Sequence, residues 1–476
     1  MTDLHLPLDR SAGRLAAQIA AGFRGAIRAG RLTAGTRLPS SRDLARDLEV
    51  SRGVVVTAYE QLIAEGFLVA RRGDGTRVAR LARPETPEPP ATDPEPAEPA
   101  PAGRAEPPGP PPYDLRPGTP DLGAFPRERW AAAVRATLRT LPNDALGYPD
   151  PAGDPALRTE LAAYLGRVRA AHLHPDRLVV VGGVAHGMAA VVRALRDVGH
   201  TTLAVEDPAS VRQLPVLEAA GVRVLRVPVD RHGVDVDALA RLDTRAVLVT
   251  PAHQYPTGVV LSPERRAALV AWARGTGGVV IEDDYDAEFR YDRDPVGCLQ
   301  GLDPDHVVLL GSVSKALAPG LRLGWAAAPP ALAARLRAHR AATDLGAPVL
   351  DQHVLAHLIR TGGYDRHLRQ MRRRYRARRD ALADALRRHA PGVTVRGVSA
   401  GIHLYVELTP GTDEDAVADA AARLGVAVAA AGPMWSRERA HAAPPALVLG
   451  YARLTEGRLV QAAELLGKAI TQRARG

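Results

Sequence analysis

The sequence predicts a multidomain protein, in which a small N-terminal α+β domain of the winged-helix type precedes a large α/β domain. Three observations support this prediction. Residues 1–80 contain short amphipathic helical patterns and a hairpin pattern, residues 81–112 are rich in proline, and residues 113–476 alternate short apolar runs with alanine-rich helical segments. A chain of 476 residues accommodates several domains of about 150 residues.

Composition excludes some classes of protein. The single cysteine, Cys298, rules out an internal disulfide framework. We find no secretory leader and no apolar run of about 18 residues, so we expect a cytoplasmic protein that has no membrane span. Only Lys315 and Lys468 are lysines among 62 basic residues, which suggests a need for an amine that can lose its proton.

The first 80 residues predict three helices and a hairpin. Apolar residues recur every four positions from Leu15, which predicts a helix that ends at Gly30. Ser40 and Ser51 are expected to cap two further short helices, which together form a helix-turn-helix. The two β-prone runs around a GDG turn at 67–78 predict a wing. The alternative is a structural appendage without a ligand.

This N-terminal pattern resembles the GntR family of bacterial transcription regulators over residues ~10–80, on the runs GTRLPSSRDLA at 35–45, VSR at 50–52 and AYEQLIAEGF at 58–67. The resemblance implies a double-stranded DNA operator as partner, and 13 arginines against 8 acidic residues make this block the most basic per residue in a chain whose net charge is +9. For each arginine, a solvated surface charge is the alternative. The expected DNA contacts lie at helix N-termini and at the wing: Arg42, Ser51, Arg52, Thr57, Arg71, Arg72 and Arg77.

Residues 81–112 contain 13 prolines and six acidic residues, with no large apolar residue after Leu81. Such a composition favours an extended, semi-rigid chain over a packed core. We therefore expect an interdomain linker. A proline-rich recognition segment is the alternative.

The strongest motif of the large domain is GSVSKALAPGLRLGW at 311–325. A lysine that forms a Schiff base must lose its proton readily, and we expect Arg322 to lower the pKa of Lys315 while it neutralises a phosphate. The pattern resembles the fold-type I pyridoxal 5'-phosphate (PLP) aminotransferases, which implies an α/β fold with a large and a small subdomain. It also implies PLP held as an aldimine on Lys315, with Ser312 and Arg322 at the phosphate.

The run VIEDDYD at 280–286 places a carboxylate cluster at the end of a predicted strand. In the family that this chain resembles, an aspartate here pairs with the protonated pyridine nitrogen and a tyrosine bonds the ring hydroxyl. We assign these roles to Asp283 and Tyr285. Asp284 is the other candidate for the aspartate that pairs with the pyridine nitrogen, because three acidic residues in a row do not show which one ends the strand on the ligand side. An acidic surface patch without a ligand is the alternative.

Further segments follow in the order that the resemblance implies. The loop TPAHQYPTG at 250–258 places Tyr255 by the ring hydroxyl, and LGYPDPAG at 146–153 places Tyr148 at the phosphate of a neighbouring subunit, which implies a homodimer. The run GYARL at 450–454 places Arg453 where the family binds an amino acid carboxylate. A structural arginine is the alternative.

Two departures weaken the resemblance. The family's phosphate loop is replaced by GGVAH at 182–186, so the phosphate would depend on backbone N–H groups at Gly183 and Val184. Ser210 stands where an aromatic residue stacks on the ring, unless His186 substitutes for it, and Arg212 offers a ligand contact nearby.

The order of winged helix, linker and aminotransferase-like domain resembles the MocR subfamily of GntR regulators over almost the whole chain. The resemblance implies a PLP-responsive transcription regulator of PLP synthesis or of amine and amino acid metabolism, nucleoid-associated when bound, with a small amine or amino acid effector and no metal. The alternatives are a functional aminotransferase with an appended DNA-binding module, and a regulator that has lost PLP. We expect that catalysis is not the physiological role.

Overall fold

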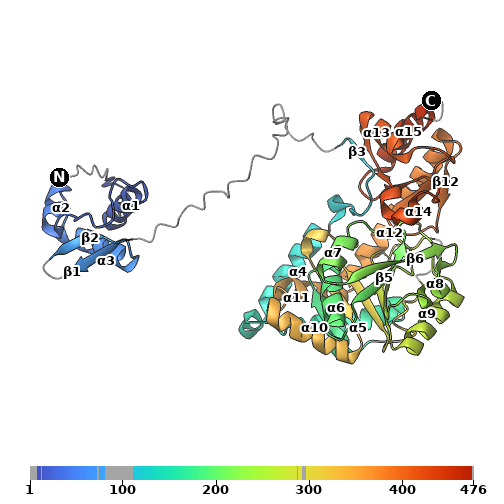
Figure 1. Ribbon diagram of the computed structural model, residues 1–476, viewed down its shortest axis with the longest axis horizontal. Helices are drawn as coiled ribbons and strands as arrows, with labels where there is room; N and C mark the ends of the chain where they lie inside the picture. Colours follow the sequence, from blue (N-terminus) through green and yellow to red (C-terminus); the bar gives the residue numbers. More distant parts are fainter. Residues whose placement is uncertain are drawn as a thin grey trace. The chain divides into compact units, whose positions relative to one another are not determined.

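The computed structural model describes residues 8–11, 13–71, 74–80, 111–286, 288–291 and 296–473. The chain divides into two compact units, Met1–Arg104 and Ala105–Gly476 (Figure 1). Residues 81–110 of the expected linker lie outside the described residues.

The N-terminal unit is a winged helix, as the sequence predicts. Ser40 caps the second helix by accepting a hydrogen bond from the Asp43 backbone N–H, and the buried core includes Ile19, Phe23 and Leu62. The two strands form an antiparallel hairpin in which Leu68 pairs with Val78. The elements of this unit are α1 (Leu15–Arg28), α2 (Ser41–Asp47), α3 (Arg52–Ala64), β1 (Leu68–Arg71) and β2 (Gly75–Val78).

The second unit is built on an eight-stranded sheet with the order β4-β11-β10-β9-β8-β5-β6-β7. Five central strands run parallel, and β11 and β7 are antiparallel to their neighbours, so the expected mostly parallel sheet is confirmed. The strands are β4 (Leu178–Val181), β5 (Thr202–Asp207), β6 (Arg223–Asp230), β7 (Gly233–Val234), β8 (Ala246–Val249), β9 (Val279–Asp283), β10 (Val307–Ser312) and β11 (Gly324–Ala327).

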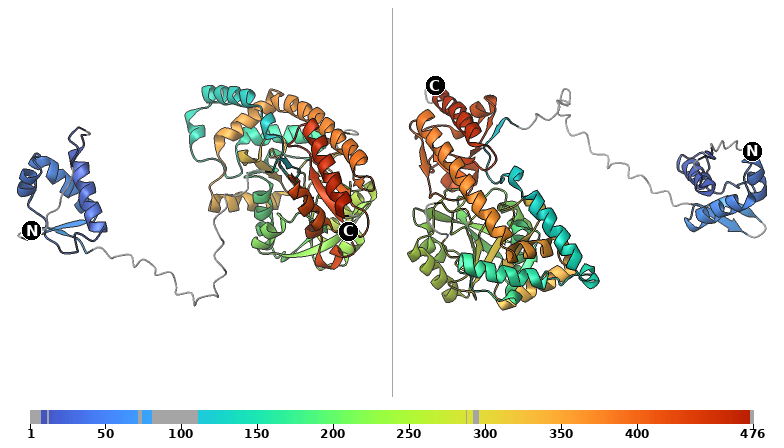
Figure 2. Two further views of the ribbon diagram at one scale, coloured as in Figure 1. Left: turned by 90° about the horizontal axis from the view of Figure 1, so that it is seen from above. Right: turned by 180° about the vertical axis from the view of Figure 1, so that it is seen from behind.

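Helices surround this sheet (Figures 1 and 2). They begin at recognisable caps; Asp154 and Ser262, for example, accept backbone N–H bonds at the start of α5 and α9. The elements are η1 (Leu122–Ala124), α4 (Arg127–Thr140), η2 (Asn143–Leu146), α5 (Pro155–Arg169), η3 (Pro175–Arg177), α6 (Val184–Arg196), α7 (Leu214–Ala219), α8 (Val236–Ala240), α9 (Pro263–Thr276), η4 (Pro319–Leu321), α10 (Pro330–Thr343), α11 (Val349–Arg360) and α12 (Gly363–His389).

A smaller subdomain follows α12 and contains a four-stranded antiparallel sheet with the order β12-β13-β16-β15. A second, two-stranded sheet pairs β14 with β3, the first strand after the linker. These elements are β3 (Tyr113–Asp114), β12 (Thr394–Arg396), β13 (His403–Glu407), α13 (Glu414–Arg423), β14 (Val426–Ala427), β15 (Ala429–Ala430), η5 (Gly432–Met434), α14 (Arg437–Ala440), β16 (Ala446–Gly450) and α15 (Glu456–Arg473).

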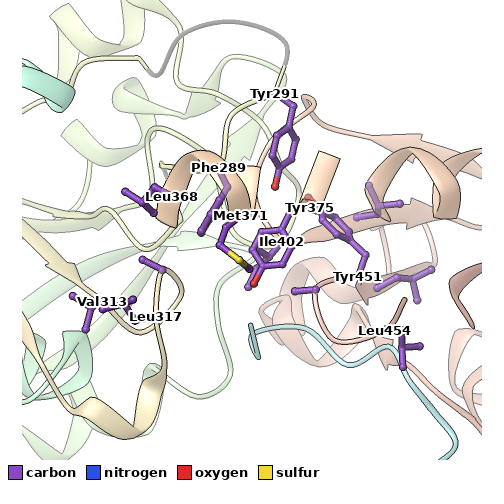
Figure 3. Close-up of a cluster of buried hydrophobic side chains, with 14 of the residues drawn as sticks. Phe289, Tyr291, Val313, Leu317, Leu368, Met371, Tyr375, Ile402, Tyr451 and Leu454 are labelled. Atoms are coloured by element: carbon purple, nitrogen blue, oxygen red, sulfur yellow. The ribbon is translucent and has the colours of Figure 1, made fainter. Parts of the chain in front are cut away.

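One buried cluster connects the two subdomains (Figure 3). Val313 and Leu317 come from the loop that carries Lys315, and Tyr451 and Leu454 flank Arg453. Met371, on α12, belongs to the same cluster. Apolar packing therefore supports both ends of the expected ligand site. In the part of the chain that the structure describes, every helix is too short or too polar to span a membrane.

Candidate functional site

The expected cofactor residues lie where strands of the large sheet end. Strands β5, β8, β9 and β10 are mutually parallel, and β4 shares their direction because two antiparallel pairings separate it from β10. The residues that follow these strands therefore meet at one edge of the sheet, the usual ligand position in such folds. They are Gly183 after β4, Arg212 after β5, Tyr255 after β8, Asp283 at the end of β9, and Ser312 at the end of β10.

Lys315 lies in the loop after β10, and its Nζ donates a hydrogen bond to the Gly118 carbonyl. Burial lowers the pKa of Lys315, and the positive charge of Arg212 lowers it further. The carboxylates of Asp286 and Asp283 raise the pKa of Lys315. The sequence-based assignment of the lowered pKa to Arg322 is therefore wrong. A half-buried amine with a lowered pKa is suited to covalent attachment of an aldehyde.

Asp283 is 3% exposed, and its Oδ2 accepts a hydrogen bond of 2.7 Å from Gln213 Nε2. Among the described residues, none is a hydrogen-bond partner for its Oδ1. Burial raises the pKa of this carboxyl to about 7, while Gln213 and Lys315 lower it. An unpartnered buried oxygen on a carboxyl close enough to Lys315 to interact with its charge fits the protonated nitrogen of a pyridine ring.

Asp284, the other candidate for pairing with the pyridine nitrogen, already has an ion-pair partner within the chain. Its two oxygens accept hydrogen bonds of 2.8 and 2.9 Å from Nε and Nη2 of Arg169, a buried residue of α5. A carboxylate already held in a bidentate ion pair has less to gain from a cofactor nitrogen than Asp283 does. The geometry thus favours Asp283.

The two tyrosines expected at the ring hydroxyl lie beside each other. Their ring centroids are 6.1 Å apart, in an edge-to-face arrangement. The Tyr285 hydroxyl donates to the His253 carbonyl at 3.0 Å and lies 3.1 Å from His253 Nδ1, which also contacts Asp286 Oδ2 at 3.0 Å. Burial raises the pKa of Tyr255 to about 12, so its hydroxyl keeps its proton and can donate. Sequence reasoning missed His253, although it stands in the same loop as Tyr255.

Gly183, Ser312 and Arg322, predicted at the phosphate, lie close together and are called the cradle residues below. Gly183 has a φ of 90°, and a Cβ at this position would lie 3.2 Å from Arg322 Nη1. A Cβ on Gly324 would lie 3.0 Å from Gly183 Cα and 3.1 Å from the Ser312 Cβ. Helix α6 begins at Val184, so its free N–H groups and positive end face an anion held there.

His186 supports this turn. Its Nδ1 accepts the Gly182 backbone N–H at 3.0 Å and lies 3.3 Å from Nη1 of Arg340, which is 1% exposed. Burial lowers the pKa of His186, with a further contribution from Arg340, so the ring stays neutral and can accept. These bonds fix the backbone whose N–H groups would contact phosphate. Arg340 carried no motif and was not predicted.

Three residues that were predicted to contact a ligand differ in whether their side chains are free to do so. Arg453 donates to Asp114 Oδ2 through its Nη1, so the arginine expected to bind a carboxylate already has one within the chain. Arg212 is exposed. Tyr148, expected at a neighbouring subunit's phosphate, is 91% exposed.

The segment with Ser210 also supplies Gln213, the partner of Asp283. Nothing in the sequence at 206–213 marked Gln213 beforehand.

The winged helix exposes most of the residues predicted to contact DNA. Arg42, Ser51, Arg52 and Thr57 are all exposed, and Arg52 Nε donates to Ser41 Oγ of the preceding helix at 3.3 Å. The guanidinium of Arg52 therefore lies between α2 and α3, where a phosphate or base edge could replace the serine.

On the wing, Arg71 is exposed and Arg72 lies outside the described residues. Arg77 is half-buried and donates to both oxygens of Asp74, at 2.7 and 2.9 Å, and to the Gly35 carbonyl. These bonds tie the Arg77 side chain to the wing and to the residue before α2. Arg37 is exposed, and its Nε lies 3.3 Å from the Cβ position of Gly75 at the wing turn.

Two family models match the chain. The model for bacterial regulatory proteins of the gntR family matches residues 15–78, and the model for aminotransferase class I and II matches residues 118–463. The pyridoxine biosynthesis transcriptional regulator PdxR of Corynebacterium glutamicum is 35% identical, with 88% of each chain covered. The probable rhizopine catabolism regulatory protein MocR of Rhizobium meliloti is 33% identical over 94% of this chain and 92% of its own.

Solved structures resemble the second unit. An archaeal alanine:glyoxylate aminotransferase has a TM-score of 0.69 at 25% identity, covering 76% of this chain and 91% of its own. LysN, the alpha-aminoadipate aminotransferase of Thermus thermophilus, has a TM-score of 0.67 at 26% identity, covering 76% and 93%. Its structure was determined with N-(5'-phosphopyridoxyl)-L-leucine bound.

Proposed function

The chain belongs to the MocR-type regulators of the GntR family, and on that premise we propose that it controls genes of PLP synthesis in response to PLP. It is a DNA-binding transcription regulator whose second unit has the aminotransferase fold and binds PLP. The target genes follow from the regulator named for pyridoxine biosynthesis at 35% identity. Chromosomal DNA as partner would place the protein in the bacterial cytoplasm.

The observation that supports a role for PLP is the unpartnered, buried Oδ1 of Asp283, whose carboxyl interacts with the charge of Lys315. PLP, when bound, supplies an aldehyde that condenses with amines and a pyridine ring that withdraws electrons. In the proposed site, Lys315 would hold the cofactor, Asp283 would keep a proton on the ring nitrogen, and Tyr285 and Tyr255 would bind the ring hydroxyl. The cradle residues Gly183, Ser312 and Arg322, together with the backbone N–H of Val184 at the start of α6, would hold the phosphate.

Further parts of the proposal concern assembly. The domain boundaries are residues 1–80, 81–112 and 113–476, and the exposed Tyr148 completes the phosphate site of a second copy in a homodimer. The effector is a small amine or amino acid, whose carboxylate binds Arg453 and Arg212. A dimer would present two winged helices to paired half-sites.

The experiment is a footprint of the full-length protein on DNA upstream of its own gene and of PLP-synthesis genes, with and without PLP and at two salt concentrations. Protection that changes with PLP, and that weakens steeply with salt, supports the proposal. Protection that is identical with and without PLP would remove PLP as the signal.

A working aminotransferase is the second candidate, favoured by the complete pair of Lys315 and Asp283. The relative named 2-aminoadipate transaminase of Thermus thermophilus is 29% identical over 74% of this chain. Steady transamination with a keto acid that disappears in Lys315→Ala would support this candidate. PLP-loaded protein that does not turn over would count against it.

A further inference from the structure

His253 and Asp286 form a buried pair in contact with Tyr285. His253 follows β8 and Asp286 follows β9, and these parallel strands bring both residues to the same edge of the sheet. Asp286 Oδ2 lies 3.0 Å from His253 Nδ1, and the side chains of His253 and Asp286 are 3% and 1% exposed. The Tyr285 hydroxyl lies 3.1 Å from the same nitrogen, and Tyr285 is only half-buried. The pair itself is shielded from solvent, whereas the tyrosine that it contacts is partly exposed.

The two neighbours of His253 Nδ1 determine where its proton lies. An ionised carboxylate only accepts hydrogen bonds, so the contact with Asp286 requires a proton on Nδ1. The Tyr285 oxygen can accept from the same N–H, which leaves the single hydroxyl proton of Tyr285 for donation. In the structure this proton is donated to the His253 carbonyl at 3.0 Å. Burial and the charge of Asp286 raise the pKa of Tyr285 well above its ordinary value, so the hydroxyl keeps its proton.

We propose that His253, held by Asp286, is a positioning residue that makes Tyr285 a hydrogen-bond donor to the ring oxygen of the cofactor. The ring oxygen would replace the His253 carbonyl as acceptor, while the N–H of His253 occupies the tyrosine oxygen. The inference rests on the proposed function, because it takes Tyr285 as a residue that binds the ring hydroxyl. It adds the two buried residues that set the direction of this hydrogen bond.

Packing from the small subdomain confines the pair. A Cβ on Gly401, shortly before β13, would lie 2.5 Å from both Asp286 Oδ2 and His253 Nδ1, so no larger residue fits there. The ring centroid of His403, the first residue of β13, lies 4.9 Å from that of His253. Burial lowers the pKa of His403 to about 4, so this second imidazole is uncharged at neutral pH. Gly401 therefore limits the movement of the pair, and His403 adds no charge to it.

The pair also lies among the charged groups that act on Lys315. Burial lowers the pKa of Lys315, the carboxylates of Asp286 and Asp283 raise it, and the charge of Arg212 lowers it. A substitution at Asp286 would therefore change both the hydrogen bonds of His253 and the charge near the lysine. A substitution at His253 leaves these three charges in place, so it isolates the effect of the hydrogen bond.

The test uses full-length protein and follows the absorption band of lysine-bound PLP as the pH is varied. A hydrogen bond to the ring oxygen stabilises its negative charge, and so lowers the pH at which lysine-bound PLP loses its proton. His253→Gln carries an amide nitrogen at the place of Nε2 instead of Nδ1, and should raise this pH midpoint by about one unit. His253→Asn carries its amide nitrogen at the place of Nδ1, and should keep the midpoint near that of wild type.

Two further variants show whether His253 acts through the tyrosine. Tyr285→Phe should raise the midpoint as well, and His253→Gln should add nothing in that background. His403→Gln is the matched control, because it removes the neighbouring imidazole and keeps a donor at the place of Nε2, which contacts a backbone carbonyl at 3.0 Å. It should leave the midpoint at the wild-type value. An unchanged midpoint in folded His253→Gln overturns the proposal, and so does an equal shift in the Tyr285→Phe background.

A second measurement needs no cofactor. Nuclear magnetic resonance of histidine-labelled, PLP-free protein reports which ring nitrogen of His253 carries the proton, and His253→Asn identifies the signal by its loss. We expect a proton on Nδ1 at neutral pH, and a proton on Nε2 alone would overturn the proposal. Absence of the PLP band in wild type, with the proton found on Nδ1, would instead overturn the proposed function, so the two failures are distinguishable.

Discussion

Replacement of Asp283 by asparagine should stabilise the cofactor-free protein at high pH while it weakens PLP binding. Without cofactor, burial raises the pKa of this carboxyl from 3.8 to about 7. The unfolded chain releases the proton near 3.8, so the folded state loses stability as the pH rises towards 7, by about 1.4 kcal/mol per pH unit.

Between about pH 5 and pH 8 this loss amounts to about 3 kcal/mol, because it begins below pH 5 and ends near pH 7. The asparagine is neutral throughout. The free energy of unfolding of Asp283→Asn, relative to wild type, should therefore increase by about this amount across the same range. Denaturant titration of the cofactor-free proteins at the two pH values measures the difference.

The same variant should bind PLP at least about ten-fold more weakly, because a hydrogen bond to a charged partner is worth about 1.5–3 kcal/mol. Asp284→Asn is the matched control. It breaks the buried pair with Arg169 and should destabilise the protein by about 3–5 kcal/mol at both pH values. If the difference between Asp283→Asn and wild type is the same at pH 5 and pH 8, the carboxyl is not held neutral by burial and the reasoning is wrong.

Three further outcomes are expected. Lys315→Ala should abolish the absorption band of lysine-bound PLP, and an unchanged spectrum would refute the attachment site. Arg322→Ala should weaken PLP binding about ten-fold and remove competition by inorganic phosphate, since its guanidinium lies against Gly183; persisting phosphate competition would place the phosphate elsewhere. Arg52→Ala should weaken operator binding and reduce the salt slope by about 1 without any change in PLP content; a normal footprint would exclude α3 as the recognition helix.

Local patterns were sufficient for most of the fold. Four-residue spacing, the Ser40 cap and the hairpin pattern predicted the winged helix because each depends on a few neighbouring residues. Ser51 precedes α3 as expected, but its side chain makes no capping hydrogen bond. Lys315 was recognisable because a lone lysine in its motif is a local signal.

Predictions about which charged groups meet were less successful. Arg77, predicted to contact DNA, pairs with Asp74 of the wing and donates to the Gly35 carbonyl before α2. Arg322 was expected to lower the pKa of Lys315, yet burial does so, with a further contribution from Arg212. Both cases concern long side chains, whose partners depend on packing rather than on sequence distance.

The sequence by itself therefore predicted the order of domains, the strand ends that meet at one edge of the sheet and Lys315 as the cofactor lysine. Only the tertiary structure showed that Asp284 is already paired, with Arg169, 115 residues away, which favours Asp283. It also brought Asp114 onto Arg453 across 339 residues. The physical reason is that periodicity and capping act over a few residues, whereas the pairing of buried charges is set by which elements pack together.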